Sequence, residues 1–112
     1  MNKTFELLVS LALLFAAPSV LAKMSSAEID AARSSFQSSG CSSCHSARDS
    51  AAGPSLKAIA KRYKGKAVVA ELADRIRTGS QGHWGDMPHP AIDYLSQAEA
   101  ALMAEWILSG AR

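Results

Sequence analysis

Both cysteines of the chain lie in one short motif, Cys41-Ser42-Ser43-Cys44-His45. Three chemistries use two cysteines at this spacing: a thioredoxin-like redox pair, a zinc site and the covalent attachment of a c-type haem. A redox pair is expected in a βαβ context, but in no segment do apolar and polar residues alternate for long enough to predict a strand. A structural zinc site needs four ligands, and two cysteines with scattered histidines are a poor set. A histidine directly after the second cysteine favours haem attachment, with a short disulfide or a free thiol pair as the alternative.

The spacing of this motif suits the chemistry of haem attachment. Two thiols add across two vinyl groups that are a fixed distance apart on the ring, and two intervening residues in a helical turn place both sulfurs along that edge. The next residue, His45, then directs its imidazole at the iron. We therefore expect one haem c, attached covalently through Cys41 and Cys44, with His45 as the proximal ligand.

The length and composition favour a single globular domain. The chain has 112 residues, of which 48% are apolar and 20% are charged, and this is ordinary globular composition. The net charge of +2 is too small to indicate nucleic-acid binding, and no nucleic-acid motif is present. The sequence contains no Walker loop, G-x-G-x-x-G, G-x-S-x-G or H-E-x-x-H motif, so most large enzyme classes are poorly supported.

Residues 1–22 have the pattern of a cleaved secretory signal peptide. Lys3 supplies a positive start, the stretch from Leu7 to Ala17 is apolar apart from one serine, and Val20-Leu21-Ala22 resembles a cleavage site. A retained membrane anchor is the alternative, but the apolar run is shorter than the roughly 20 residues that a span needs. We expect export to the periplasm, where c-type haem is attached, and a mono-haem domain over residues 23–112 with no membrane span.

Capping and periodicity predict an all-α domain of four short helices that position this motif. Two capping boxes, Ser25-x-x-Glu28 and Ser96-x-x-Glu99, begin the first and last helices. The first helix is expected to run to about residue 38, the second from residue 56 to the glycine at 65, the third over 67–78, and the last to near residue 110. The inward positions are expected at Ala32 and Phe36, at Val69, Leu72 and Ile76, and at Ala98, Leu102 and Trp106.

The chain resembles the class I c-type cytochromes, and most closely the small bacterial cytochrome c-551/c-552 subfamily. The matching segments are the haem motif, Gly53-Pro54, Glu71 to Ile76, Gly79 to Gly85 and Ala104 to Ser109. The resemblance covers essentially all of residues 23–112. It implies the small class I cytochrome c fold, with its helices wrapped around one covalently attached haem.

The resemblance also implies roles for three further residues. The Pro54 carbonyl would accept the second imidazole proton of His45 and so orient the proximal ligand. Arg75 and Trp84 would hydrogen-bond a haem propionate. Without the resemblance, these residues would be read as a turn proline, a solvated arginine and a core tryptophan.

The distal iron ligand is expected from the segment that follows Trp84. In the subfamily this ligand is a methionine followed by proline, five residues after the tryptophan. Met87 precedes a proline but lies only three residues after Trp84, whereas His89 lies at the subfamily spacing but is a different residue type. Met87 is the favoured ligand and His89 the alternative. A thioether raises the reduction potential, and a second imidazole lowers it relative to methionine.

Protein ligands on both faces of a haem leave no open coordination site, so one-electron transfer is the expected function. We expect a periplasmic electron carrier that is not an enzyme and that is monomeric. A dedicated cytochrome subunit of a periplasmic oxidoreductase is the alternative. A haem enzyme or gas sensor with a labile sixth ligand is less favoured.

A cluster of five positive charges within ten residues gives a clue to partners: Lys57, Lys61, Arg62, Lys64 and Lys66. Such a basic rim would steer the protein toward acidic surfaces of transient redox partners. The alternative is a solvated helix face. The sequence does not identify the electron donor or acceptor.

Overall fold

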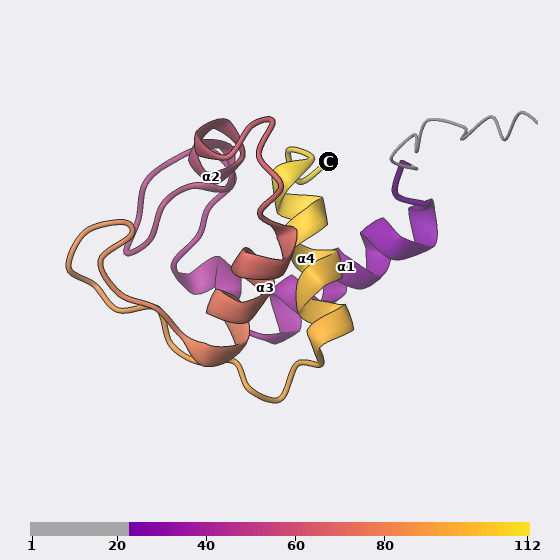
Figure 1. The fold of residues 1–112 in the computed structure, drawn as a ribbon. Coiled ribbons are helices and arrows are strands. Elements are labelled where there is room, and N and C mark those ends of the chain that lie inside the picture. The colour runs from indigo at the N-terminus through magenta and orange to yellow at the C-terminus, as the bar shows by residue number, and fades with distance from the viewer. Residues whose placement is uncertain (1–22) are drawn as a thin grey trace, which may run out of the picture.

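The structure is a computed structural model that describes residues 23–112, and the expected signal peptide, residues 1–22, lies outside the described residues. Figure 1 shows four α-helices and a short 3-10 turn in the described part of the chain: α1 Ser26–Ser38, η1 Cys41–Ser43, α2 Leu56–Arg62, α3 Val69–Thr78 and α4 Gln97–Leu108. Between residues 23 and 112 the only β pairing is an isolated antiparallel bridge from Ser80 to His89. The predicted all-α class is confirmed.

The predicted helices are found, but two boundaries differ. The second predicted helix runs to the glycine at 65, whereas α2 ends at Arg62. The predicted third helix begins at residue 67, whereas α3 begins at Val69. Its N-cap residue, Val68, makes no side-chain capping hydrogen bond, so no capping side chain marks the boundary. The boundary is instead visible in the backbone, where Leu72 N donates to Val68 O over 2.9 Å.

Both predicted capping boxes are present. At the start of α4, Ser96 Oγ accepts a hydrogen bond from Glu99 N at 3.1 Å, and Ser96 N donates to Glu99 Oε2 at 2.7 Å. The hydrogen bond from the Ser96 backbone lowers the pKa of Glu99, because it favours the charged carboxylate. The same reciprocal arrangement begins α1.

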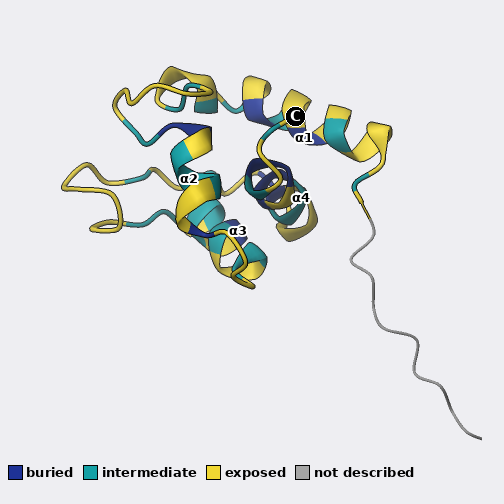
Figure 2. Ribbon diagram, turned by 90° about the horizontal axis from the view of Figure 1, so that it is seen from above, coloured by how far each residue is buried: buried dark blue, intermediate teal, exposed yellow. Residues whose placement is uncertain are grey.

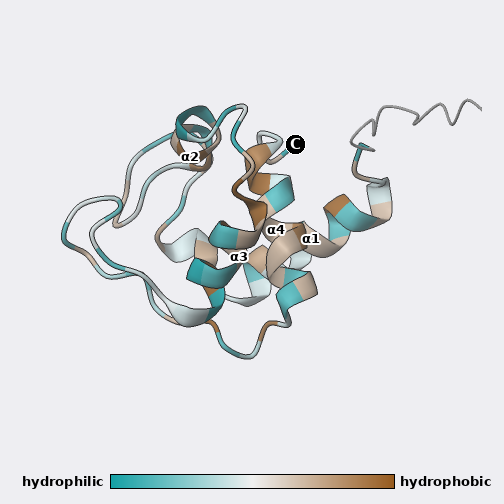
Figure 3. Cartoon of the chain, in the orientation of Figure 1, coloured by the Kyte–Doolittle hydropathy of each residue, from teal (hydrophilic) through white to brown (hydrophobic). Residues whose placement is uncertain are grey.

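Helix α4 is the centre of the packing, because α1, α2 and α3 all contact it. In Figure 2 the buried faces of the surrounding helices turn toward α4. Phe36 of α1 meets Trp106 of α4 edge to face, with ring centroids 5.4 Å apart. Figure 3 shows apolar residues along α4, whereas the loop over residues 79–90 is mostly polar.

One predicted core position is wrong. Ala98 is exposed, and the buried positions of α4 are Ala100, Met103, Ala104, Trp106 and Ile107. Because α4 packs against three helices, its buried surface is wider than a single stripe and does not follow the 98/102/106 register. Among residues 23–112, no helix combines the length and the apolar character that crossing a membrane requires.

The capping of α4 makes a prediction about stability. Replacing Ser96 with Ala removes the hydrogen bond to Glu99 N and should lower the free energy of unfolding by about 1 kcal/mol. Thermal or denaturant unfolding of the purified protein measures this loss. Ser34→Ala, at an exposed position of α1, is a control that leaves both capping boxes intact. Equal stability of the Ser96 variant and the wild type would contradict the role of the cap.

Candidate functional site

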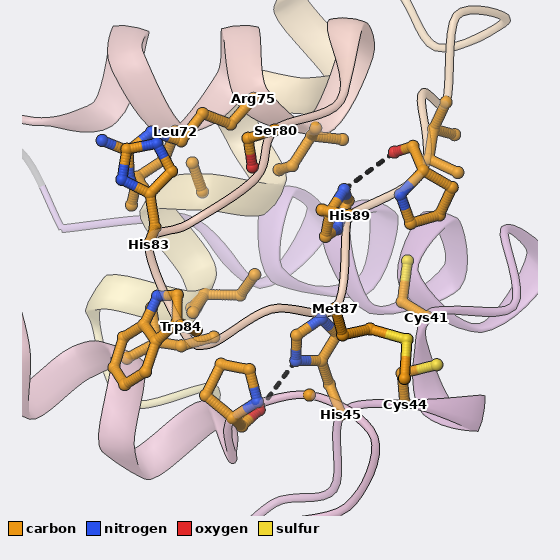
Figure 4. Close-up of a pocket in the computed structure, with 18 of the residues that line it drawn as sticks. Cys41, Cys44, His45, Leu72, Arg75, Ser80, His83, Trp84, Met87 and His89 are labelled. Carbon is orange, nitrogen blue, oxygen red and sulfur yellow. Dashed lines mark hydrogen bonds between the residues drawn. The ribbon is translucent and has the colours of Figure 1, made fainter.

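A cavity of about 270 Å³ lies between the helices and the loop over residues 79–90. Its apolar wall is built from all four helices and includes Phe36, Leu56, Ile59, Leu72, Ile76, Met103 and Ile107. All eight residues that the sequence singled out line this one cavity: Cys41, Cys44, His45, Pro54, Arg75, Trp84, Met87 and His89. Figure 4 shows most of them around the space. The fold therefore gathers residues from four separate segments into one site.

The two cysteines are positioned by the turn η1. Gly40 precedes this turn with φ +72°, a left-handed conformation that glycine adopts without strain. His45 N donates to Cys41 O at 2.9 Å, which winds the motif into a tight turn. Both cysteines are free thiols, and partial burial raises the pKa of Cys41. Figure 4 shows their side chains on the same side of the cavity.

His45 is held in one orientation by the segment that follows the motif. Its Nδ1 lies 2.7 Å from Pro54 O, the contact that the sequence led us to expect. A carbonyl only accepts, so Nδ1 carries the proton and Nε2 is left with a free lone pair. Gly53 makes this close approach possible, because a Cβ there would lie 2.8 Å from Cε1 of the His45 ring.

His89 lies on the opposite wall of the cavity from His45. The two ring centroids are 6.0 Å apart, and the ring planes are tilted by 34°. His89 Nδ1 lies 2.8 Å from Pro90 O. Burial lowers the pKa of His89, and the contact with Pro90 O opposes this effect. Met87 also lines the cavity, but its side chain is 65% exposed.

Arg75 and Trp84 lie at one end of the cavity, and both contact the side chain of Tyr63. Arg75 Nη1 donates to the Tyr63 hydroxyl at 3.0 Å, and Arg75 also pairs with Glu71. The Tyr63 ring packs edge to face against Trp84, with centroids 6.4 Å apart. No local signal in the sequence links Tyr63 to Arg75.

Arg62 contributes to the same end of the cavity. Its guanidinium carbon lies 4.3 Å above the Trp84 ring centroid, and its Nη1 donates to His83 O at 2.5 Å. The sequence grouped Arg62 with the neighbouring lysines as part of a docking rim. Only its residue type distinguishes Arg62 from these lysines. A planar guanidinium stacks on aromatic rings, and a lysine ammonium does not stack in this way.

These residues fit a covalently bound haem. The donor set comprises two free thiols, which can form thioethers, and one imidazole whose Nε2 is free. The surrounding wall is mostly apolar, as the faces of a porphyrin require. Because Gly53 has no Cβ, the His45 ring can lie close to the backbone and keep this orientation.

Comparison with known proteins agrees with this fit. The sequence profile of the family described as Cytochrome c matches residues 23–111. The chain is 43% identical over 75 residues to cytochrome c-551 of Pseudomonas aeruginosa, covering 66% of this chain and 71% of that protein. It is 39% identical over 75 residues to cytochrome c-551 of Azotobacter vinelandii, covering 66% of this chain and 90% of the relative.

The fold is similar to that of a solved cytochrome structure. The crystal structure of wild-type Nitrosomonas europaea cytochrome c552 superimposes with a TM-score of 0.65 and 34% sequence identity, covering 70% of this chain and 98% of that chain. The expected small class I cytochrome c fold is confirmed.

The fold and the cavity thus define a small class I haem protein. The chain belongs to the cytochrome c family, and within it to the class I cytochromes of the c-551/c-552 type. Its cofactor is one haem c, attached covalently through Cys41 and Cys44. Its role at the coarsest level is that of a haem-c electron carrier.

The close contact at Gly53 makes a prediction about the site. Gly53→Ala would place a Cβ 2.8 Å from His45 Cε1, so the ring must rotate away from Pro54 O. We expect a loss of about 1–3 kcal/mol in the free energy of unfolding, with a changed ferric absorption spectrum. Ala51→Ser, at a nearby exposed position, is the control. A Gly53 variant with the stability and spectrum of the wild type would show that the contact is unimportant.

Proposed function

We propose that this protein is a periplasmic one-electron carrier whose haem iron is bound by a protein side chain on each face. The observation that carries the proposal is the pair of opposed walls in the cavity, with His45 on one and the segment over residues 87–89 on the other. The haem supplies one-electron chemistry, because its iron alternates between the ferric and ferrous states. With both faces covered by protein ligands, no coordination site is open to a substrate.

On the proximal side, His45 is the proposed ligand through Nε2. The hydrogen bond from Nδ1 to Pro54 O fixes the ring plane and increases the basicity of the ligating nitrogen. On the distal side, the ligand comes from Met87 or His89, which both line the cavity. Because both walls are held by the protein, the ligand geometry changes little between the two oxidation states, and small rearrangement keeps electron transfer fast.

At the other end of the cavity, Arg75 and Trp84 are proposed to bind a haem propionate. Both line the cavity, and the Tyr63 side chain links them. The half-buried guanidinium of Arg75 offers a positive charge to a carboxylate, and the Trp84 indole offers one N–H donor. A charge-assisted hydrogen bond of this kind would fix the orientation of the ring edge.

The periplasmic location rests on the pattern of residues 1–22. A positively charged start, an apolar run and a small-residue ending are typical of a signal peptide that is removed on export. The domain proposed to remain is residues 23–112, acting as a monomer.

The carrier function predicts a closed iron site. In the purified holoprotein, the haem should be reduced and reoxidised reversibly by one electron, and the ferrous form should bind carbon monoxide only weakly near neutral pH. A redox titration followed by absorption spectroscopy, with and without carbon monoxide, measures both properties. Rapid carbon monoxide binding would indicate a labile sixth ligand and favour a haem enzyme or gas sensor. Stoichiometric co-purification with a catalytic protein would favour a dedicated oxidoreductase subunit.

Docking to redox partners is proposed to use the lysines of the basic segment. Lys57, Lys61, Lys64 and Lys66 are exposed on and just after α2, whereas Arg62 contacts His83 and Trp84. Four ammonium groups beside the cavity would attract an acidic partner surface. Interfaces between transient redox partners are small, so attraction need not produce tight binding.

This docking surface predicts that electron transfer depends on salt. The second-order rate with an acidic redox partner should fall about tenfold between about 0.01 M and 1 M salt, because ions screen the attraction. Lys61→Gln should lower the rate at low salt. Arg33→Gln, which removes the same charge from α1, should not. Stopped-flow kinetics measures these rates, and equal slowing by both variants would count against a local docking surface.

A further inference from the structure

We infer that His89, rather than Met87, is the distal iron ligand, so that the haem lies between two histidines. This inference rests on the proposed carrier function and specifies its sixth ligand. The two candidates lie two residues apart on one loop and both line the cavity. The two candidates differ in the contacts that position their side chains.

The distance between the two histidine rings fits a shared metal ion. Two imidazoles that bind one metal from opposite sides have ring centres roughly 6 Å apart, since each metal–nitrogen bond is about 2 Å and each nitrogen lies about 1 Å from its ring centre. The ring centroids of His45 and His89 are 6.0 Å apart. In Figure 4 the two rings come from opposite walls of the cavity.

Both histidines are oriented by the same kind of contact. His45 Nδ1 donates to Pro54 O, and His89 Nδ1 donates to Pro90 O at 2.8 Å. In each ring the proton is therefore on Nδ1, and the lone pair on Nε2 is left for a metal. Histidines that bind metals commonly use their other ring nitrogen in this way. A surface histidine with no such role has no need of a fixed tautomer.

The backbone at His89 is fixed by contacts across the loop. Ser80 N donates to His89 O at 3.2 Å, and His89 N donates to Ser80 O at 2.8 Å. Gly79 lies against the same carbonyl, since a Cβ at Gly79 would be 2.9 Å from His89 O. These contacts tie His89 to the end of α3, so its side chain enters the cavity from a defined position.

Met87 is held much less firmly. Met87 is 65% exposed, whereas His89, which lines the same cavity, is partly buried. The backbone of residues 81–88 makes no hydrogen bond to other backbone groups, and it accepts one from the Arg62 side chain at His83 O.

The position of His89 in the sequence supports the same conclusion. It lies five residues after Trp84 and precedes a proline, which is the spacing of the methionine ligand in the subfamily that this chain resembles. A histidine at the ligand position needs no change in loop length. A methionine ligand at position 87 needs the loop shortened by two residues. The spacing therefore indicates that a histidine replaces the methionine at the ligand position.

The spectrum and the reduction potential of the purified holoprotein test this inference. A weak ferric charge-transfer band in the red marks an iron–methionine bond. We expect wild-type protein to be low-spin without this band, and Met87→Leu to change neither the spectrum nor the potential. His89→Met should introduce the band and raise the potential, because a thioether favours ferrous iron. Met87→Leu is the matched control, since it alters the same loop and preserves apolar bulk.

The opposite pattern would overturn the inference. A wild-type band that is lost in Met87→Leu and kept in His89→Ala would assign Met87 as the ligand. In that case, reversible one-electron redox chemistry and weak carbon monoxide binding would still support the carrier function. Rapid carbon monoxide binding by the ferrous wild type would instead contradict both, because neither side chain would then close the site.

Discussion

The helices of this cytochrome pack around an apolar cavity, and the rest of the structure depends on what that cavity must hold. Phe36, Leu56, Met103 and Ile107 belong to the buried core and also line the cavity. A domain of this size buries a modest fraction of its surface, and each Å² of apolar contact is worth about 25 cal/mol. A porphyrin between these walls adds apolar contact that the side chains alone do not provide. The covalent attachment at Cys41 and Cys44 is therefore part of the stability of the fold as well as of its chemistry.

The two walls of the cavity are positioned by different kinds of contact. The proximal wall is local: a tight turn carries the motif, and the Pro54 carbonyl, nine residues along the chain, orients His45. The distal wall is assembled from more distant segments, because Ser80 pairs with His89 and Arg62 of α2 binds the backbone at His83. The proximal ligand is thus specified as soon as the motif folds, whereas the distal ligand depends on how α2 and α3 meet the loop.

The same difference explains what the sequence could predict. The haem motif and the two capping boxes depend on neighbours within ten residues and were recognisable from spacing, whereas the contact between His45 and Pro54 was implied by the resemblance to the subfamily. The start of α3 has no capping side chain, and the exposure of Ala98 depends on how α4 is surrounded, so both were misjudged. The contact from Arg62 to His83 spans 21 residues and has no local signal. The proposal of a histidine as the distal ligand uses the distance between two rings that lie far apart in the chain.

The choice between the two distal candidates is a competition between metal preference and backbone hydrogen bonding. Soft sulfur favours ferrous iron, and in a freely flexible loop Met87 would compete well for it. In this chain, two hydrogen bonds between Ser80 and His89 hold the backbone of His89 in place, each worth about 0.5–1.5 kcal/mol. The contact from His89 Nδ1 to Pro90 O holds the ring as well. On the proposed assignment, these hydrogen bonds hold His89 at the ligand position, and the reduction potential is lower than a methionine ligand would give.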